Sequence, residues 1–119
     1  MNSIEVNFVD HNLQKYDTCG DYYMEGDILK FIISKTGNTV YDRLVLIHEM
    51  VEQLLTEQKG IKEEIITDFD VNFKGDGEPG DDPQAPYADE HCFATGIEKM
   101  ICAYLGIKWK EYDDCIEQL

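Results

Sequence analysis

The chain has 119 residues, 43% of them hydrophobic, and carries 25 acidic against 10 basic residues, a formal net charge of −15. This length suits one domain with a single hydrophobic core. The acidic excess argues against direct nucleic-acid binding, because phosphate contacts require a basic surface. It leaves three interpretations: cation binding, an acidic surface that engages a basic protein, or a well-solvated exterior.

The N-terminal stretch and the cysteines favour a cytoplasmic protein. The first residues, MNSIEVNFVDHN, are polar and mixed, unlike a signal peptide, and no apolar run approaches the ~20 residues of a membrane span. The four cysteines contain no CxxC pair, which is typical of reduced thiols. We expect no membrane contact, and we expect Cys92 and Cys102 to be small core residues on a helix.

The N-terminal third predicts a small, mostly antiparallel sheet of two or three strands. Residues 4–9 alternate apolar and polar side chains, and residues 28–34 are rich in β-branched and aromatic side chains. Tyr22 and Tyr23 would extend this sheet across a turn at residues 25–27.

Two long helices and a short one are predicted after the strands. Residues 40–58 and 88–105 have a helical period, and Gly60 and Gly106 are expected to end these helices. Residues 107–118 predict a short closing helix, and its expected packing residues are Ile107, Trp109, Tyr112 and Ile116. We expect the long helices to pack through their apolar stripes, which consist of Leu44, Ile47, Val51, Leu54 and Leu55 in the first and Phe93, Ile97, Met100, Ile101, Tyr104 and Leu105 in the second.

The segment between the long helices is less regular. Residues 61–66 predict a helical turn, and residues 67–73 predict a strand or an irregular return. On such a strand Asp68 and Asp70 would share one side, either to hold a divalent cation or as a solvated face. Residues 74–87 contain three glycines and all three prolines, and therefore predict a long loop.

These elements predict a single α+β domain over residues 1–119. The sheet would pack on two main helices and a short C-terminal helix, in a minimal zincin-like arrangement.

The first long helix carries an HExxE motif, formed by His48, Glu49 and Glu52. Because His48 and Glu52 are four residues apart, their side chains leave the same face of the helix. Zinc hydrolases place ligands at this spacing and an acid directly after the first histidine, where it serves as general base. Their motif is HExxH, so Glu52 replaces a histidine here. A carboxylate oxygen is still an accepted zinc ligand.

The second long helix offers a third ligand, His91. His91 and Glu98 are seven residues apart and therefore lie nearly in line on one face. Packing of the two helices would bring His91 to His48 and Glu52, with Glu98 as a ligand or as the group that orients a histidine.

The sequence therefore predicts zinc or another divalent metal bound by His48, Glu52 and His91, with Glu49 as the catalytic residue. Asp81 and Asp82, in the loop before the second helix, would either reach the same site or act only as turn residues. His11 has no partner at ligand spacing.

The stretches KYDTCGDYY, LVLIHEMVEQLL, TDFDVNF, EPGDDPQAPYADEHCFATGIE and LGIKWKEY together resemble a family of small uncharacterised proteins encoded by bacteria and their phages. The resemblance spans nearly the whole chain and implies an intracellular single domain with a motif-bearing helix pair, but no named activity. The likeness to zincin metallohydrolases covers only His48 and Glu49.

Three functional hypotheses follow. The first is a small metal-dependent hydrolase of peptidase type. The second is a non-catalytic, acidic phage-type module that binds a protein or peptide partner, in which His48 and His91 are only packed side chains. The third is a structural metal ion that clamps the two helices together.

Overall fold

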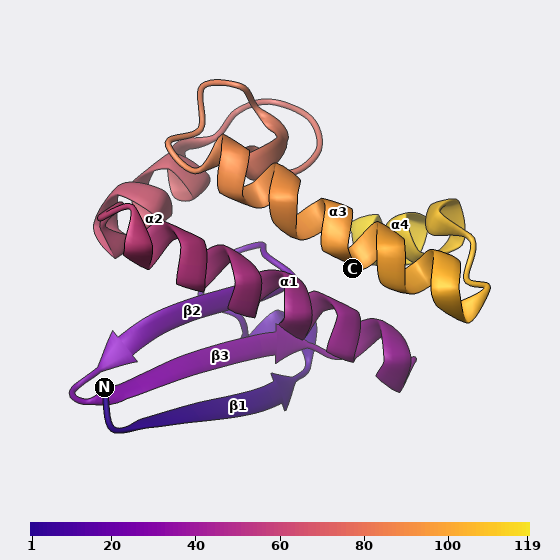
Figure 1. Cartoon of the computed structure of the whole chain (residues 1–119), viewed down its shortest axis with the longest axis horizontal. Coiled ribbons are helices and arrows are strands. Elements are labelled where there is room, and N and C mark those ends of the chain that lie inside the picture. The colour runs from indigo at the N-terminus through magenta and orange to yellow at the C-terminus, as the bar shows by residue number, and fades with distance from the viewer.

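A three-stranded mixed sheet forms one layer of the computed structural model, which describes residues 1–119 (Figure 1). β3 (Ile28–Ser34) is central, pairing in parallel with β1 (Ser3–Val9) and antiparallel with β2 (Gly20–Glu25). The expected mostly antiparallel sheet is therefore wrong for β1. Residues 10–19, which include the 3-10 turn His11–Leu13, carry the chain past the end of β3 to its other edge before β2 begins.

The helices form two further layers, which makes the domain α+β. α1 (Thr39–Gln58) lies along one face of the sheet, and α3 (Ala88–Leu105) lies on the side of α1 away from the sheet (Figure 1). α4 (Trp109–Glu117) is beside α3, and α2 (Glu63–Asn72) follows α1. None of these helices combines the length and the apolar composition that crossing a membrane requires.

Local signals at the ends of the long helices explain why their predicted bounds are confirmed. The Asn38 side chain accepts hydrogen bonds from the backbone N–H groups of Val40 and Tyr41, at 2.9 and 3.1 Å, and so caps the start of α1. Gly106 ends α3 in the left-handed conformation, at φ 74°.

The expected strand or irregular return over residues 67–73 is wrong, because α2 continues to Asn72. Ile66 and Phe69, three positions apart, share a helical face that packs on the small cluster of Ala85 and Tyr87. Between α2 and α3 the predicted loop contains only the 3-10 turn Pro79–Asp81.

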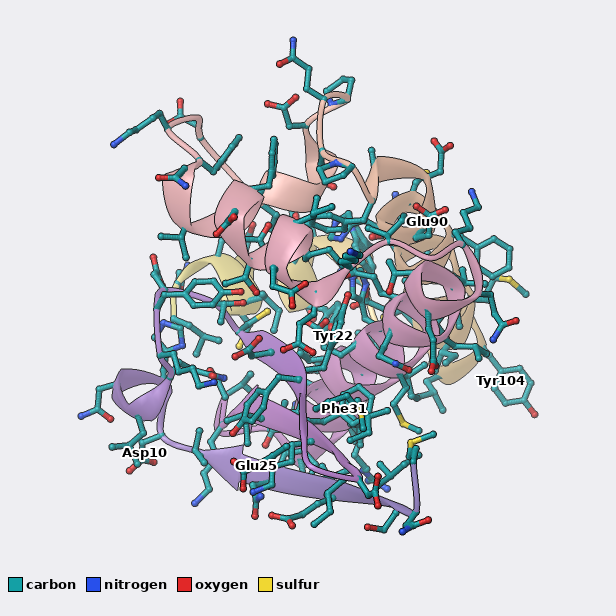
Figure 2. The ribbon with its side chains drawn as sticks, turned by 90° about the vertical axis from the view of Figure 1, so that its left-hand side faces the viewer. Asp10, Tyr22, Glu25, Phe31, Glu90 and Tyr104 are labelled. Atoms are coloured by element: carbon teal, nitrogen blue, oxygen red, sulfur yellow. The ribbon has the colours of Figure 1, made fainter.

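The main core lies between the sheet and the helices. Phe31, seen inside the protein in Figure 2, packs there with the other buried members of the cluster, which are Leu29, Ile33, Leu44, Val45, Cys102 and Tyr112. Cys102 is buried as expected, whereas Cys92 is exposed, which corrects the prediction for that residue. No disulfide is formed, since all four thiols are free.

The prediction that α3 packs through its apolar stripe is wrong for most of that stripe. Tyr104 is 90% exposed and projects into solvent in Figure 2, and the other exposed members are Phe93, Met100 and Leu105. Leu54 of the predicted α1 stripe is also exposed. α3 instead buries the face that carries Glu90, His91, Ala94, Glu98 and Cys102, because the polar members of that face have partners on α1 and in the loops.

Candidate metal centre

Three potential ligand atoms from α1 and α3 converge. Nε2 of His48 lies 3.1 Å from Oε2 of Glu52, and Nδ1 of His91 lies 3.1 Å from the first atom and 3.0 Å from the second. In a tetrahedral zinc site, with bonds of about 2.0–2.1 Å, ligand atoms are roughly 3.3 Å apart. The three residues predicted as ligands are therefore brought together at nearly the spacing that a small divalent ion requires.

Their position follows from the helix geometry. His48 and Glu52 are one turn apart on α1, while His91 lies in the first turns of α3, which packs against α1. All three side chains are buried, with residue exposures of 7%, 4% and 6%. A buried cluster of two imidazoles and a carboxylate is costly unless its members are paired or bind an ion.

Glu98 orients the His48 ring. Nδ1–H of His48 donates a hydrogen bond to Oε1 of Glu98, and the hydroxyl of Tyr112 on α4 donates to Oε2 of Glu98 at 2.5 Å. A hydrogen bond of this kind fixes the tautomer of a ligating histidine and leaves the other ring nitrogen free for the metal. Of the two roles predicted for Glu98, this contact fits the orienting one, because Glu98 bonds to His48 and lies outside the ligand group.

Tyr22 fixes the orientation of Glu52 in a similar way. Its hydroxyl donates to Oε1 of Glu52 at 3.0 Å, so that Oε2 is the oxygen turned toward the two histidines. Tyr22 is half-buried and lies near the middle of the view in Figure 2, and β2 thereby supports the cluster from the sheet layer.

Protonation follows the charge pattern of this cluster. Burial lowers the pKa of His91, but the carboxylates of Glu52 and Glu78 raise it to about 10. Burial likewise opposes the charge on His48, yet its bonds to Glu52 and Glu98 raise its pKa well above the ordinary value. For Glu52 burial raises the pKa, and the two histidines lower it to about 2. A metal ion would thus have to displace protons from both rings.

Glu49 is buried beside the cluster. Burial raises the pKa of its carboxyl group well above the ordinary value, the charge of Glu52 raises it further, and the two histidines oppose this shift. A Cβ atom at position 20 would lie 2.6 Å from Cγ of Glu49, so Gly20 at the start of β2 leaves the room that this side chain occupies. A carboxyl group with a raised pKa near a metal site is suited to proton transfer.

The second nitrogen of His91 faces the loop before α3. Nε2 lies 3.0 Å from Oδ1 of Asp81 and 3.2 Å from Oε2 of Glu78, but it makes no hydrogen bond to either carboxylate. Asp82 is not brought into this group: its Oδ1 accepts a hydrogen bond from the backbone N–H of Gln84, as a turn residue does.

A cleft of about 730 Å³ adjoins the cluster, and His48, Glu49, Glu52 and His91 line it. Twelve of its lining residues are Asp or Glu, whereas Lys99 is the single Lys or Arg, so the cleft carries a strong negative potential. His11 lies at this cleft but outside both ligand groups, with its ring nitrogens 2.9 Å from Ser34 Oγ and 3.0 Å from Asp17 Oδ1.

Asp70 also lines the cleft. Because α2 is a helix, Asp70 turns inward while Asp68 is exposed, and the predicted pair of carboxylates on one side of a strand is wrong. Asp70 accepts hydrogen bonds from the hydroxyls of Tyr87 and Tyr16. Burial raises the pKa of Asp70 to about 6, against the lowering effect of the Tyr87 bond.

Comparison with known proteins finds no matching family model, no matching curated protein and no matching solved structure. The resemblance to the phage-encoded family and the local likeness to zincins therefore stay predictions, and the function of the site has to be inferred from its own geometry.

Sequence reasoning missed four supporting residues of this site. Tyr112 was expected only to pack, Tyr22 only to form a strand, and Gly20 and Glu78 were assigned no role. Glu78 lies three residues before Asp81 in the same loop, ahead of His91. This spacing is the one local signal from which its position near His91 could have been predicted. The contacts of the others join segments far apart in the chain, which no local pattern encodes.

Proposed function

We propose that this protein binds a zinc ion through His48, Glu52 and His91 and uses it in a metal-dependent hydrolase reaction. The observation that carries the proposal is the mutual separation of 3.0–3.1 Å among the three ligand atoms. Two further features support it. Glu98 is hydrogen-bonded to His48, and Tyr22 is hydrogen-bonded to Glu52. Groups that do not touch the ion orient its ligands in this way in metal sites.

Zinc in this position would polarise a substrate carbonyl and lower the pKa of a coordinated water to about 7. The roles of the protein groups follow from their surroundings. Glu49, directly after His48, accepts the proton of the attacking water in its ionised form and returns it to the leaving group; its raised pKa favours the first of these transfers. Glu98 keeps the His48 ring in the ligating tautomer.

The charge of the cleft favours one class of substrate. With twelve acidic and one basic lining residues, the cleft repels phosphate esters and nucleotides. An amide or ester bond in an uncharged or cationic segment is compatible with this potential, and a peptide is the simplest example. The preferred reaction is therefore hydrolysis of a peptide-like bond rather than of a phosphoester.

Metal analysis of the untagged protein tests the proposal first. After zinc loading and dialysis against metal-free buffer, we expect one tightly held zinc per chain, and none in the His48→Ala variant. His11→Ala is the matched control, because His11 lies outside both ligand groups. Retention of no zinc by the wild-type protein would overturn the proposal. Activity is then screened with fluorogenic peptides of neutral, basic and acidic composition.

A metal-free ion-pair network is the alternative that the raised histidine pKa values favour. In that case two protonated rings would hold the Glu52 carboxylate, and the cluster would only join α1 to α3. Zinc titration separates the two interpretations, because a network alone would leave the melting temperature unchanged by zinc. Binding of a basic protein partner stays a prediction from the net charge.

A further inference from the structure

We propose that a second divalent cation binds on the opposite side of the His91 ring, between Nε2 of His91, Oε2 of Glu78 and Oδ1 of Asp81. We call the three proposed zinc ligands, His48, Glu52 and His91, the zinc triad. The second site shares only His91 with this triad. It rests on the proposed function in one respect, namely that Nδ1 of His91 binds the first ion. The imidazole of His91 would then join two ions, one bound at each ring nitrogen.

The first observation is a buried nitrogen without a hydrogen-bond partner. His91 is 6% exposed, and its Nε2 is one of only two buried side-chain polar atoms in the chain that make no hydrogen bond. Buried polar atoms in folded proteins nearly always have a partner, so an orphan atom of this kind points to a ligand. This observation concerns the nitrogen alone and does not depend on the acidic residues around it.

The second observation is what surrounds that nitrogen. Oδ1 of Asp81 lies 3.0 Å and Oε2 of Glu78 lies 3.2 Å from Nε2, and the three atoms form a compact ligand group. These separations are close to the roughly 3.3 Å between ligands on a common zinc ion. An imidazole nitrogen with two carboxylate oxygens is a donor set that divalent transition metals accept.

The direction of the ring argues against a simpler role for the two carboxylates. A carboxylate that only orients a ligating histidine accepts the N–H of its outer nitrogen in line, as Glu98 does for His48. At His91 both oxygens are within reach, but neither is aligned to accept that hydrogen bond. An ion between the three atoms accounts for the arrangement, because it binds the nitrogen along its lone pair while the oxygens lie to the side.

Gly80 fixes this loop against the ring. A Cβ atom at position 80 would lie 2.5 Å from Nδ1 and Cγ of His91, so only glycine lets the backbone between Glu78 and Asp81 lie against the imidazole. The side chain of Asp81 is 66% exposed and that of Glu78 is 41% exposed. The second ion would therefore be open to solvent and bound more weakly than the first.

Binding of the second ion displaces the proton of Nε2 into the buffer, so that the ring becomes a bridging imidazolate. Two zinc ions on the two nitrogens of one ring are roughly 6 Å apart, further than the ~3.5–4 Å at which paired ions share one attacking oxygen. The second ion would thus lie at the loop side of the site, as a point that attracts a carbonyl oxygen of a substrate.

Zinc stoichiometry at saturation tests the proposal. The measurement uses the full chain with Cys92→Ser, because an exposed thiol is itself a zinc ligand. Equilibrium dialysis over a range of zinc concentrations should give one tight and one weaker zinc per chain. The Glu78→Gln/Asp81→Asn variant should retain only the tight zinc. The Asp76→Asn/Asp82→Asn variant, with the same change of charge in the same loop, should retain both.

The outcomes separate this site from the zinc triad. One zinc per chain in both the parent and the Glu78→Gln/Asp81→Asn variant overturns the second site and leaves the triad intact. No zinc in the parent overturns both proposals. His91→Ala should lose both ions if the ring is shared, and a folded His91→Ala protein that retains one ion overturns the bridge. If the Asp76→Asn/Asp82→Asn control loses the weaker ion equally, the binding of that ion is nonspecific attraction by charge, which also overturns the site.

Discussion

His48 on α1 donates the hydrogen bond of its Nδ1–H to Glu98 on α3, fifty residues later in the chain. This bond aims Nε2 of His48 at Glu52 and His91, and it is supported by the 2.5 Å bond from the Tyr112 hydroxyl to the other oxygen of Glu98. α4 is thereby connected to the candidate metal centre through one carboxylate.

Loss of this carboxylate should weaken metal binding without removing a ligand. For Glu98→Gln we expect a fall in zinc affinity of about 10- to 100-fold, which is the usual effect of changing a residue that hydrogen-bonds to a metal ligand. Tyr112→Phe, which removes only the donor to Glu98, should have a smaller effect in the same direction. Competition with a chromophoric chelator measures both affinities. Unchanged affinity in folded Glu98→Gln would contradict the orienting role.

Glu49 should be needed for hydrolysis but not for zinc binding. Glu49→Gln removes the proton acceptor and preserves the size of the side chain, so zinc-dependent hydrolysis should fall by at least about 100-fold. The bound zinc, measured by elemental analysis, should stay at the wild-type level. An active Glu49→Gln protein would exclude this residue as general base.

Gly20 should be needed for the same reaction, because it leaves space for Glu49. In Gly20→Ala the new Cβ atom collides with the Glu49 side chain, and we expect lower activity, retained zinc and a loss of about 1–3 kcal/mol in the free energy of unfolding. Gly96→Ala is the matched control, because a Cβ atom there meets nothing within 4 Å and alanine favours the helix. Equal activity in the two variants would contradict the role of Gly20 in leaving space for Glu49.

The elements were predictable where local chemistry decides them. The Asn38 side chain caps α1 and Gly106 ends α3, so the types of the residues at these helix ends determine the bounds. The partner of β1 was not predictable, because an alternating pattern shows that a strand has one buried face but not which strand lies beside it.

For the site, helical spacing was enough to place His48 and Glu52 on one face, and His91 with Glu98 on another. Their convergence was harder to foresee, since α3 buries this polar face and exposes Phe93 and other apolar residues instead. Hydrophobic patterning assigns the core to apolar side chains, and it fails where polar residues satisfy one another in the interior.

Metal removal should leave the fold intact. The main core, centred on Phe31 and Leu44, contains none of the three ligands, so chelation should preserve the far-UV circular dichroism signal. Zinc at 100 times its dissociation constant should add about 2.7 kcal/mol of stability, which raises the melting temperature of a chain of this length by about 10 °C. Collapse of the helical signal on chelation would instead assign the ion a structural role.

Asp70 should make stability depend on pH in a defined direction. Its folded pKa of about 6 is raised above the unfolded value, so its contribution is fully present below the unfolded pKa and is lost as pH rises through about 6. Asp70→Asn cannot ionise and still accepts a hydrogen bond. Its stability relative to wild type should therefore increase from pH 4 to pH 7.

We expect a relative gain of about 1 kcal/mol for Asp70→Asn, since the partial exposure of Asp70 reduces what the pKa shift alone would imply. Urea unfolding of the metal-free proteins at both pH values measures it. Asp68→Asn, an exposed site two residues earlier on the same helix, removes the same charge and should show no comparable pH dependence. A stability difference for Asp70→Asn that stays constant between pH 4 and pH 7 would mean that this carboxyl group titrates normally in the folded protein.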